Sequence, residues 1–202
     1  NFDIFCLFLS AISHDTEHPG LNNGYHIKAA TYYARKYNDQ SVLENHHAAT
    51  STKQLFNEDC NFLESFPLPK QQQLRNFMIQ AILSTDMSKH VTYINNLKAR
   101  TFKWKDDNQT EEETRLIISY LMKAADICNV SRPFNLSKEW AQRLQREWIR
   151  QGKMEDEHKL QHSLPPLADN LIALANLQST RKYNSSHVCF FFFFFLSLFI
   201  KL

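Results

Sequence analysis

Three side chains in one short stretch could together bind a metal ion. The stretch AISHDTEHPGLNN places Asp15 directly after His14, with His18 four residues beyond the first histidine. Imidazole nitrogens and carboxylate oxygens are ligands of Zn²⁺, and carboxylates with water suit Mg²⁺ or Mn²⁺. Because residues four apart share one face of a helix, the two histidines could point into one cleft. Two histidines near a helix end are also common as exposed or hydrogen-bonded residues, so this stretch alone leaves both interpretations open.

A distant partner for these ligands is expected at the end of another predicted helix. Asp126 follows the apolar run 121–125, and we expect it at the inner end of a helix. A carboxylate in such a place is costly unless it is paired or bound to a metal. Helical bundles assemble metal sites from side chains on several helices, so Asp126 is the best distant partner for His14 and Asp15.

Two further polar clusters also have simpler explanations. In YNDQSVLENHH, Glu44 lies close to His46 and His47, but Ser41-x-x-Glu44 has the spacing of a capping box at a helix start. The stretch STDMSKH, which contains Thr85, is typical of an ordinary polar helix end. Several such clusters on predicted helices are harder to dismiss than one.

The elements that position these clusters are predicted to be α-helices. Apolar residues recur at helical spacing over 74–85, over 116–124 after a capping box at Thr110-x-x-Glu113, and over 140–148 between an N-cap at Ser137 and a stop at Gly152. Residues 65–70 and 103–109 are expected to be loops. The chain has only 3 glycines and no long strand-like alternation, so we predict an all-α bundle of about seven or eight helices.

The composition favours one globular domain in a reducing compartment. A chain of 202 residues suits a single domain, since single cores stop growing near ~250–300 residues. Its 23 basic and 21 acidic residues give a net charge of +2, which gives no reason to expect a nucleic acid partner. The 4 cysteines lie far apart without a C-x-x-C pair, as free thiols do. We therefore expect a cytoplasmic protein.

The two ends of the chain differ from those of a typical domain. The first residues are apolar but lack the basic region and cleavage site of a signal peptide, so we expect a buried helix in a chain that looks like a fragment. Cys189–Ile200 is apolar and contains six consecutive phenylalanines, but a membrane span needs ~20 residues. It could be an interfacial or core segment. We favour a segment that is not natively coded, and we expect no membrane attachment.

Five stretches together resemble the successive signatures of the class I 3′,5′-cyclic nucleotide phosphodiesterase catalytic domain. They are HDTEHPGLNN, YNDQSVLENHH, STDMSKH, ADICNVSRP and EWIRQGKMEDE, in the family's order and at about its spacing. The resemblance covers residues 2–169 and implies an incomplete all-α, HD-type catalytic domain. Such a domain hydrolyses cAMP or cGMP to the 5′-monophosphate with two divalent metals. We assign residues 1–178 to this domain and residues 179–202 to an atypical tail.

The resemblance also implies how the metals are held. His14, Asp15 and Asp126 would bind the tightly held ion, usually zinc, and Asp15 would bridge to a second ion, usually Mg²⁺ or Mn²⁺. Three further side chains would hold the waters of that second ion: His18, Glu44 and Thr85.

Two residues match positions that contact the nucleotide. Asn129 matches a residue that hydrogen-bonds the purine, and an asparagine there leans towards cAMP. Gln178 matches the glutamine that clamps the purine, although its spacing is about one residue short. The family's general acid and one further histidine ligand lie in an H-N-x-x-H motif upstream of the position of Asn1. We therefore expect no catalytic acid within the chain and no activity from this fragment by itself.

Two other functions stay open at this point. The chain could be another HD-type metal-dependent nucleotide phosphohydrolase, because that class shares the H-D pair and a distant aspartate. It could also be a non-catalytic remnant that only folds or binds a partner. The stretches SVLENHH and TDMSKH favour the phosphodiesterase, with a cyclic nucleotide as the substrate.

Overall fold

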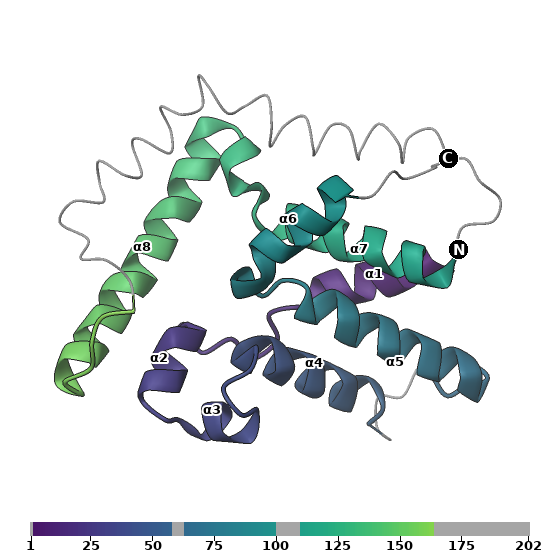
Figure 1. The fold of residues 1–202 in the computed structure, drawn as a ribbon, viewed down its shortest axis with the longest axis horizontal. Coiled ribbons are helices and arrows are strands. Elements are labelled where there is room, and N and C mark those ends of the chain that lie inside the picture. The colour runs from purple at the N-terminus through teal and green to yellow at the C-terminus, as the bar shows by residue number, and fades with distance from the viewer. Residues whose placement is uncertain (1, 58–62, 100–109, 164–202) are drawn as a thin grey trace. The chain divides into compact units, whose positions relative to one another are not determined.

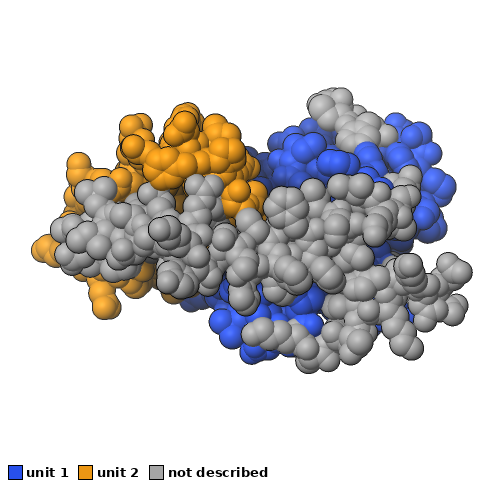
Figure 2. Space-filling model, turned by 90° about the horizontal axis from the view of Figure 1, so that it is seen from above, with its two compact units in different colours: residues 1–18, 36–123 blue, residues 19–35, 124–202 orange. Residues whose placement is uncertain are grey.

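Two compact units make up the chain. The structure, a computed structural model, describes residues 2–57, 63–99 and 110–163 (Figure 1). Unit 1 comprises residues 1–18 and 36–123, and unit 2 comprises residues 19–35 and 124–202. Figure 2 shows the two units in different colours.

The described residues form eight α-helices and no strand, which confirms the all-α prediction. The α-helices are α1 (Phe2–Ser13), α2 (Asn23–Lys28), α3 (Tyr32–Lys36), α4 (Val42–Leu55), α5 (Leu68–Leu83), α6 (His90–Ala99), α7 (Glu111–Asp126) and α8 (Phe134–Glu157). Two short 3₁₀ helices, η2 (Met87–Lys89) and η3 (Cys128–Ser131), lie between them. Within the described ranges, no helix has the length and apolar character that crossing a membrane requires.

Unit 1 is built around a core that α1, α5 and α7 share. The apolar positions of α5 that the sequence predicts to share one face are buried: Leu74, Phe77, Met78, Ala81 and Ile82. Cys6 from α1, and Ile118 and Met122 from α7, pack into the same cluster. Burial raises the pKa of the Cys6 thiol to about 12, so this cysteine behaves as a small apolar residue of the core.

Two helix starts show how local signals set a boundary. The predicted capping box at the start of α7 is confirmed, because the N–H of Glu113 donates to the Thr110 hydroxyl (3.2 Å) and the N–H of Thr110 donates to the Glu113 carboxylate (3.0 Å). The loop predicted for residues 65–70 is wrong in its second half, since α5 begins at Leu68. Pro69 is tolerated there because the first turn of a helix leaves its N–H groups unpaired. The loop predicted for 103–109 lies outside the described residues.

Helix α8 is longer at both ends than predicted. It begins at Phe134, and the N–H of Ser137 already donates to the Pro133 carbonyl (3.0 Å), so Ser137 is not the N-cap. It also passes through Gly152 and ends at Glu157, so the predicted stop at Gly152 is wrong. The glycine costs only about 1 kcal/mol relative to alanine in a helix, and side-chain bonds on the same helix face outweigh it.

Those bonds belong to two buried polar residues of α8, Gln151 and Glu155. The Gln151 carbonyl oxygen accepts from the N–H of Asn22 (2.9 Å), and its amide donates to the Glu155 carboxylate (3.0 Å). Both Glu155 oxygens accept from the N–H of Ser163 (3.1 and 3.2 Å). Burial raises the pKa of Glu155, but the hydrogen bonds from Ser163 and Gln151 outweigh it and lower that pKa overall. The EWIRQGKMEDE motif therefore links α8 to the segment that follows the HDTEHPG stretch.

Replacing Met78 with alanine should lower the free energy of unfolding by about 2–5 kcal/mol, because the emptied core space cannot fully collapse. Met78 is 0% exposed, whereas Met87 is 55% exposed. Met87→Ala is therefore the matched control and should change that free energy by no more than about 0.5 kcal/mol. Urea unfolding followed by circular dichroism measures both variants, and equal losses would contradict the described core.

Candidate metal centre

The HDTEHPG stretch forms a turn that directly follows α1. Because α1 ends at Ser13, the prediction that His14 and His18 lie on a helix is wrong. The Ser13 carbonyl accepts from both the N–H (3.1 Å) and the hydroxyl (2.8 Å) of Thr16, which closes a tight turn in place of a further helical turn. Glu17 then adopts a left-handed backbone with φ 61°. The positions of the two histidines are thus set by a turn and not by helical spacing.

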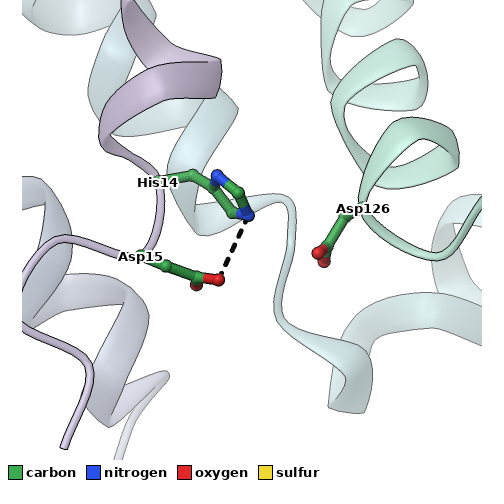
Figure 3. Close-up of side chains that lie close together, drawn as sticks. All are labelled: His14, Asp15 and Asp126. Carbon is green, nitrogen blue, oxygen red and sulfur yellow. Dashed lines mark ion pairs between the residues drawn. The ribbon is translucent and has the colours of Figure 1, made fainter. Parts of the chain in front are cut away.

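His14 and Asp15 place two ligand atoms next to each other (Figure 3). Nδ1 of His14 donates to the Ala11 carbonyl (2.8 Å), which leaves Nε2 as the nitrogen that faces Asp15. That Nε2 lies 3.3 Å from Oδ2 of Asp15. Two ligands of one tetrahedral zinc ion, each about 2.0–2.1 Å from it, stand about 3.3–3.4 Å apart, so the pair fits a single ion. Figure 3 also draws Asp126, the last residue of α7.

Helix α4 holds this turn through three buried side chains. The three hydrogen bonds run from the Ser51 hydroxyl to the Ser13 carbonyl (3.0 Å), from His47 Nδ1 to the Thr16 carbonyl (2.7 Å) and from His46 Nε2 to the Glu17 carboxylate (2.9 Å). The first bond holds Ser13 at the end of α1, and the other two hold Thr16 and Glu17 of the turn. The direction in which the turn presents Asp15 therefore depends on the packing of α4.

His47 belongs to this site, although the sequence did not single it out as a site residue. Its Nε2 lies 3.9 Å from Oδ1 of Asp15, and its ring stacks on that of His18 with centroids 5.5 Å apart. Burial lowers the pKa of His47 and outweighs the opposing effects of the Thr16 hydrogen bond and Asp15. The lowered pKa favours the neutral ring, and since Nδ1 donates to Thr16, the nitrogen that faces Asp15 is the acceptor Nε2. One sequence signal could have indicated it, since Glu44-x-x-His47 has helical spacing.

The pKa of His47 should lie below 6.5, with the neutral ring protonated on Nδ1. Since the unfolded chain binds a proton there first, the free energy of unfolding should decrease as the pH falls below 6.5 towards the lowered folded-state pKa. Long-range ¹H–¹⁵N correlation spectra over a pH titration measure the tautomer and the pKa, and His47→Gln assigns the signals. A ring that titrates at or above 6.5, or carries its proton on Nε2, would contradict this geometry.

The start of α4 is held differently from the predicted capping box. Ser41 precedes the helix with a left-handed φ of 42° and makes no side-chain cap bond, so the Ser41-x-x-Glu44 box is wrong. Its hydroxyl donates instead to the buried Asp86 carboxylate (2.7 Å), which also accepts from the N–H of Ser88 (2.8 Å). Burial raises the pKa of Asp86, but the hydrogen bonds from Ser41 and Ser88 outweigh it and lower that pKa overall. A long-range bond, not a local one, positions the helix that carries Glu44.

Ser41→Ala should lower the free energy of unfolding by about 1.5–3 kcal/mol at pH 7, because it removes a hydrogen bond to a buried ionised carboxylate. The folded-state pKa of Asp86 lies below its unfolded value, so this contribution is present above about pH 4 and is lost as the pH falls through the folded-state pKa. Denaturant unfolding at pH 7 and near pH 3 measures the difference from wild type. Ser65→Ala, at an exposed position, is the control, and a difference that does not shrink in acid would rule out Asp86 as the partner.

Thr85 and Asp126 occupy two different environments. Thr85 is buried directly after α5, and its hydroxyl donates to the Ile82 carbonyl (2.8 Å), so its oxygen can still accept from a water. Asp126 is exposed, which corrects the expectation that it lies at a buried helix end. Successive residues of a helix face different directions, so near the end of α7 the side chains of Met122 and Lys123 are buried while Ala125 and Asp126 are exposed.

The two residues predicted to contact the nucleotide have different outcomes. The Asn129 amide donates to the Ser137 carbonyl (3.2 Å), and its Oδ1 has no hydrogen-bond partner among the described residues. An acceptor atom is thus present on this side chain. Gln178 and the tail at 179–202 lie outside the described residues.

Comparison with known proteins decides the family. The sequence profile of the family described as 3′5′-cyclic nucleotide phosphodiesterase matches residues 1–202. The chain belongs to the 3′,5′-cyclic nucleotide phosphodiesterase family. This phosphodiesterase chain is 38% identical over 155 residues to the 3′,5′-cyclic-nucleotide phosphodiesterase regA of Dictyostelium discoideum, which covers 77% of the chain and 20% of that relative. It is 39% identical over 153 residues to the high affinity cGMP-specific 3′,5′-cyclic phosphodiesterase 9A of Mus musculus, which covers 76% of the chain and 28% of that relative.

The fold is also similar to a solved phosphodiesterase domain. The phosphodiesterase domain of the RhoPDE fusion protein from the choanoflagellate Salpingoeca rosetta superimposes with a TM-score of 0.75 at 32% identity, over 81% of this phosphodiesterase chain and 52% of that one. The chain therefore spans about half of that solved domain and between about a fifth and three tenths of the two curated relatives.

Proposed function

We propose that the full-length protein hydrolyses 3′,5′-cyclic nucleotides to 5′-monophosphates at a centre of two divalent metal ions. The observation that carries this proposal is the His14–Asp15 pair, whose ligand atoms stand 3.3 Å apart in a turn that α4 anchors. Membership in the family supports hydrolysis of a cyclic nucleotide as the reaction. The turn supports a metal-dependent mechanism, because it presents an imidazole nitrogen next to a carboxylate oxygen.

The tightly held ion is proposed to be zinc, bound by His14, Asp15 and Asp126. Each of the three offers one ligand atom of a kind that zinc accepts. Metal ligands must be deprotonated, and the bond from His14 Nδ1 to Ala11 leaves Nε2 able to present its lone pair. The other oxygen of Asp15, Oδ1, remains for a second ion, which we propose to be Mg²⁺ or Mn²⁺.

Three residues are proposed to hold waters bound to the second ion: His18, Glu44 and Thr85. The stacking of His18 on His47 orients its ring, and the buried Thr85 oxygen can accept a hydrogen bond from a water. When bound, the two ions supply an activated hydroxide and offset the charge that builds on the phosphoryl oxygens. The leaving 3′ oxygen needs a proton from a general acid, a role that we assign to none of these residues.

For the base, we propose a preference for cAMP that rests on Asn129. Its Oδ1 is an acceptor without a partner among the described residues, and adenine presents an amino donor where guanine presents a carbonyl acceptor. The name of the mouse relative specifies cGMP, which favours the opposite preference. Turnover of both nucleotides by the full-length protein decides between them.

Asp126→Ala should lower kcat/KM for the cyclic nucleotide by more than about 100-fold and reduce the zinc content, because loss of a direct ligand exceeds the usual 10–100-fold effect of an outer partner. Purified full-length protein is assayed with Mg²⁺ or Mn²⁺ by chromatography of the nucleotides, and zinc is measured by mass spectrometry. Asp156→Ala, at an exposed carboxylate that bonds His162, is the control and should match wild type.

Two results would overturn the proposal. Unchanged zinc content and turnover in Asp126→Ala would remove this residue from the metal centre. Wild-type protein that leaves cAMP and cGMP intact but cleaves a nucleoside monophosphate would indicate another HD-type phosphohydrolase.

A further inference from the structure

Lys123 is a buried cation that the proposed function does not use. It lies on α7 with only 3% of its side chain exposed. Its ammonium donates to the backbone carbonyls of Ser84 (3.2 Å), Thr85 (3.5 Å) and Asp86 (3.0 Å). Burying an ammonium costs several kcal/mol unless hydrogen bonds replace those that it made to water, and the three carbonyls supply such bonds.

The three carbonyls belong to consecutive residues directly after the end of α5. Ser84 is the C-cap of α5, and a cation next to a helix C-terminus is stabilised by the negative end of the helix macrodipole. Lys123 therefore adds hydrogen bonds from α7 to the backbone of the turn formed by residues 84–86. Tyr93 covers the ammonium from α6, with its ring centroid 5.8 Å from Nζ.

This turn contains one residue of the proposed centre and is bonded to the helix that carries another. Thr85, whose carbonyl Lys123 binds, is proposed to hold a metal-bound water. Asp86, whose carbonyl Lys123 also binds, accepts from Ser41 at the start of the helix that carries Glu44. Lys123 itself precedes Asp126 by three residues on the same helix. The Lys123 side chain thus contacts the backbone of Thr85 directly. It is also connected to the start of α4, which carries Glu44, through Asp86.

We propose that Lys123 is a positioning residue that sets the turn carrying Thr85, and so tunes binding of the second, water-coordinated metal ion. The inference rests on the proposed function for the role of Thr85. Because Lys123 acts through backbone carbonyls, its removal changes where the Thr85 oxygen stands without deleting that oxygen. Lys123 makes none of these hydrogen bonds to the proposed zinc ligands, so we expect zinc binding to be unaffected.

The test is Mn²⁺ binding to the full-length protein, measured from the electron paramagnetic resonance signal of free Mn²⁺ without any nucleotide. Lys123→Met should weaken Mn²⁺ binding by about 10-fold or more, the usual effect of removing an outer partner, while the zinc content stays at the wild-type level. Met122→Ala is the control, because Met122 is the adjacent, equally buried residue of α7. It should lower the thermal midpoint and leave Mn²⁺ affinity unchanged.

Coupling to Thr85 separates a positioning role from a general loss of stability. If Lys123 acts through Thr85, the double variant Lys123→Met/Thr85→Val should bind Mn²⁺ no more weakly than the weaker single variant. If Lys123→Met does not fold, Lys123→Gln, which keeps a shorter neutral donor, should give an affinity below wild type with the same dependence on Thr85.

The outcomes also distinguish this inference from the proposed function. Unchanged Mn²⁺ affinity in folded Lys123 variants, or losses that add fully with Thr85→Val, would overturn the inference and leave the proposed function standing. Weakened Mn²⁺ binding in a protein that hydrolyses no cyclic nucleotide supports the inference and overturns the proposed function. A wild-type protein that binds no Mn²⁺ overturns both.

Discussion

The turn between His14 and His18 depends on bonds that reach it from α4. Its own residues are largely exposed, with the Asp15 side chain 60% accessible, and Glu17 carries a left-handed backbone that costs about 1–2 kcal/mol. Each bond from α4 contributes about 0.5–1.5 kcal/mol, so two or three of them outweigh that strain. The conformation of the turn, and with it the position of His14 and Asp15, therefore depends on the packing of α4 against α1 and α5.

Buried polar residues make the connections that apolar packing cannot specify. The core of unit 1 fills the space between α1, α5 and α7, but apolar contacts are not directional and allow small shifts. The Ser41–Asp86 hydrogen bond fixes the start of α4. In α8, Glu155 orients the Gln151 amide, whose oxygen accepts from the N–H of Asn22. Satisfied polar groups in a low-dielectric interior favour one arrangement over its neighbours. The signature stretches of this chain thus combine the proposed metal ligands with residues whose hydrogen bonds hold the neighbouring backbone in place.

Features governed by short-range signals could be predicted from the sequence. The apolar face of α5 and the capping box before α7 depend on residues three or four apart, and both are confirmed. The end of α1 could not be predicted, because Ser51 binds the Ser13 carbonyl from 38 residues away.

The same reason explains the other differences between sequence and structure. Ser41 has the spacing of a capping residue, yet its hydroxyl bonds Asp86, 45 residues further along the chain. Gly152 is a stop signal, yet the helix continues through it, and Gln151 beside it accepts from the N–H of Asn22, 129 residues earlier in the chain. The candidate ligands His14 and Asp15 could be recognised from their residue types and spacing. The spacing Glu44-x-x-His47 places His47 on the helix face of Glu44, but its bond to Thr16, 31 residues earlier in the chain, could not be predicted.

The most direct measurement of the proposed centre is zinc K-edge X-ray absorption on the full-length protein. The account predicts a shell of nitrogen and oxygen ligands alone at about 2.0–2.2 Å, with the outer scattering of imidazole, because His14, Asp15 and Asp126 supply no sulfur. A sulfur shell near about 2.3 Å, or the absence of imidazole scattering, would contradict it.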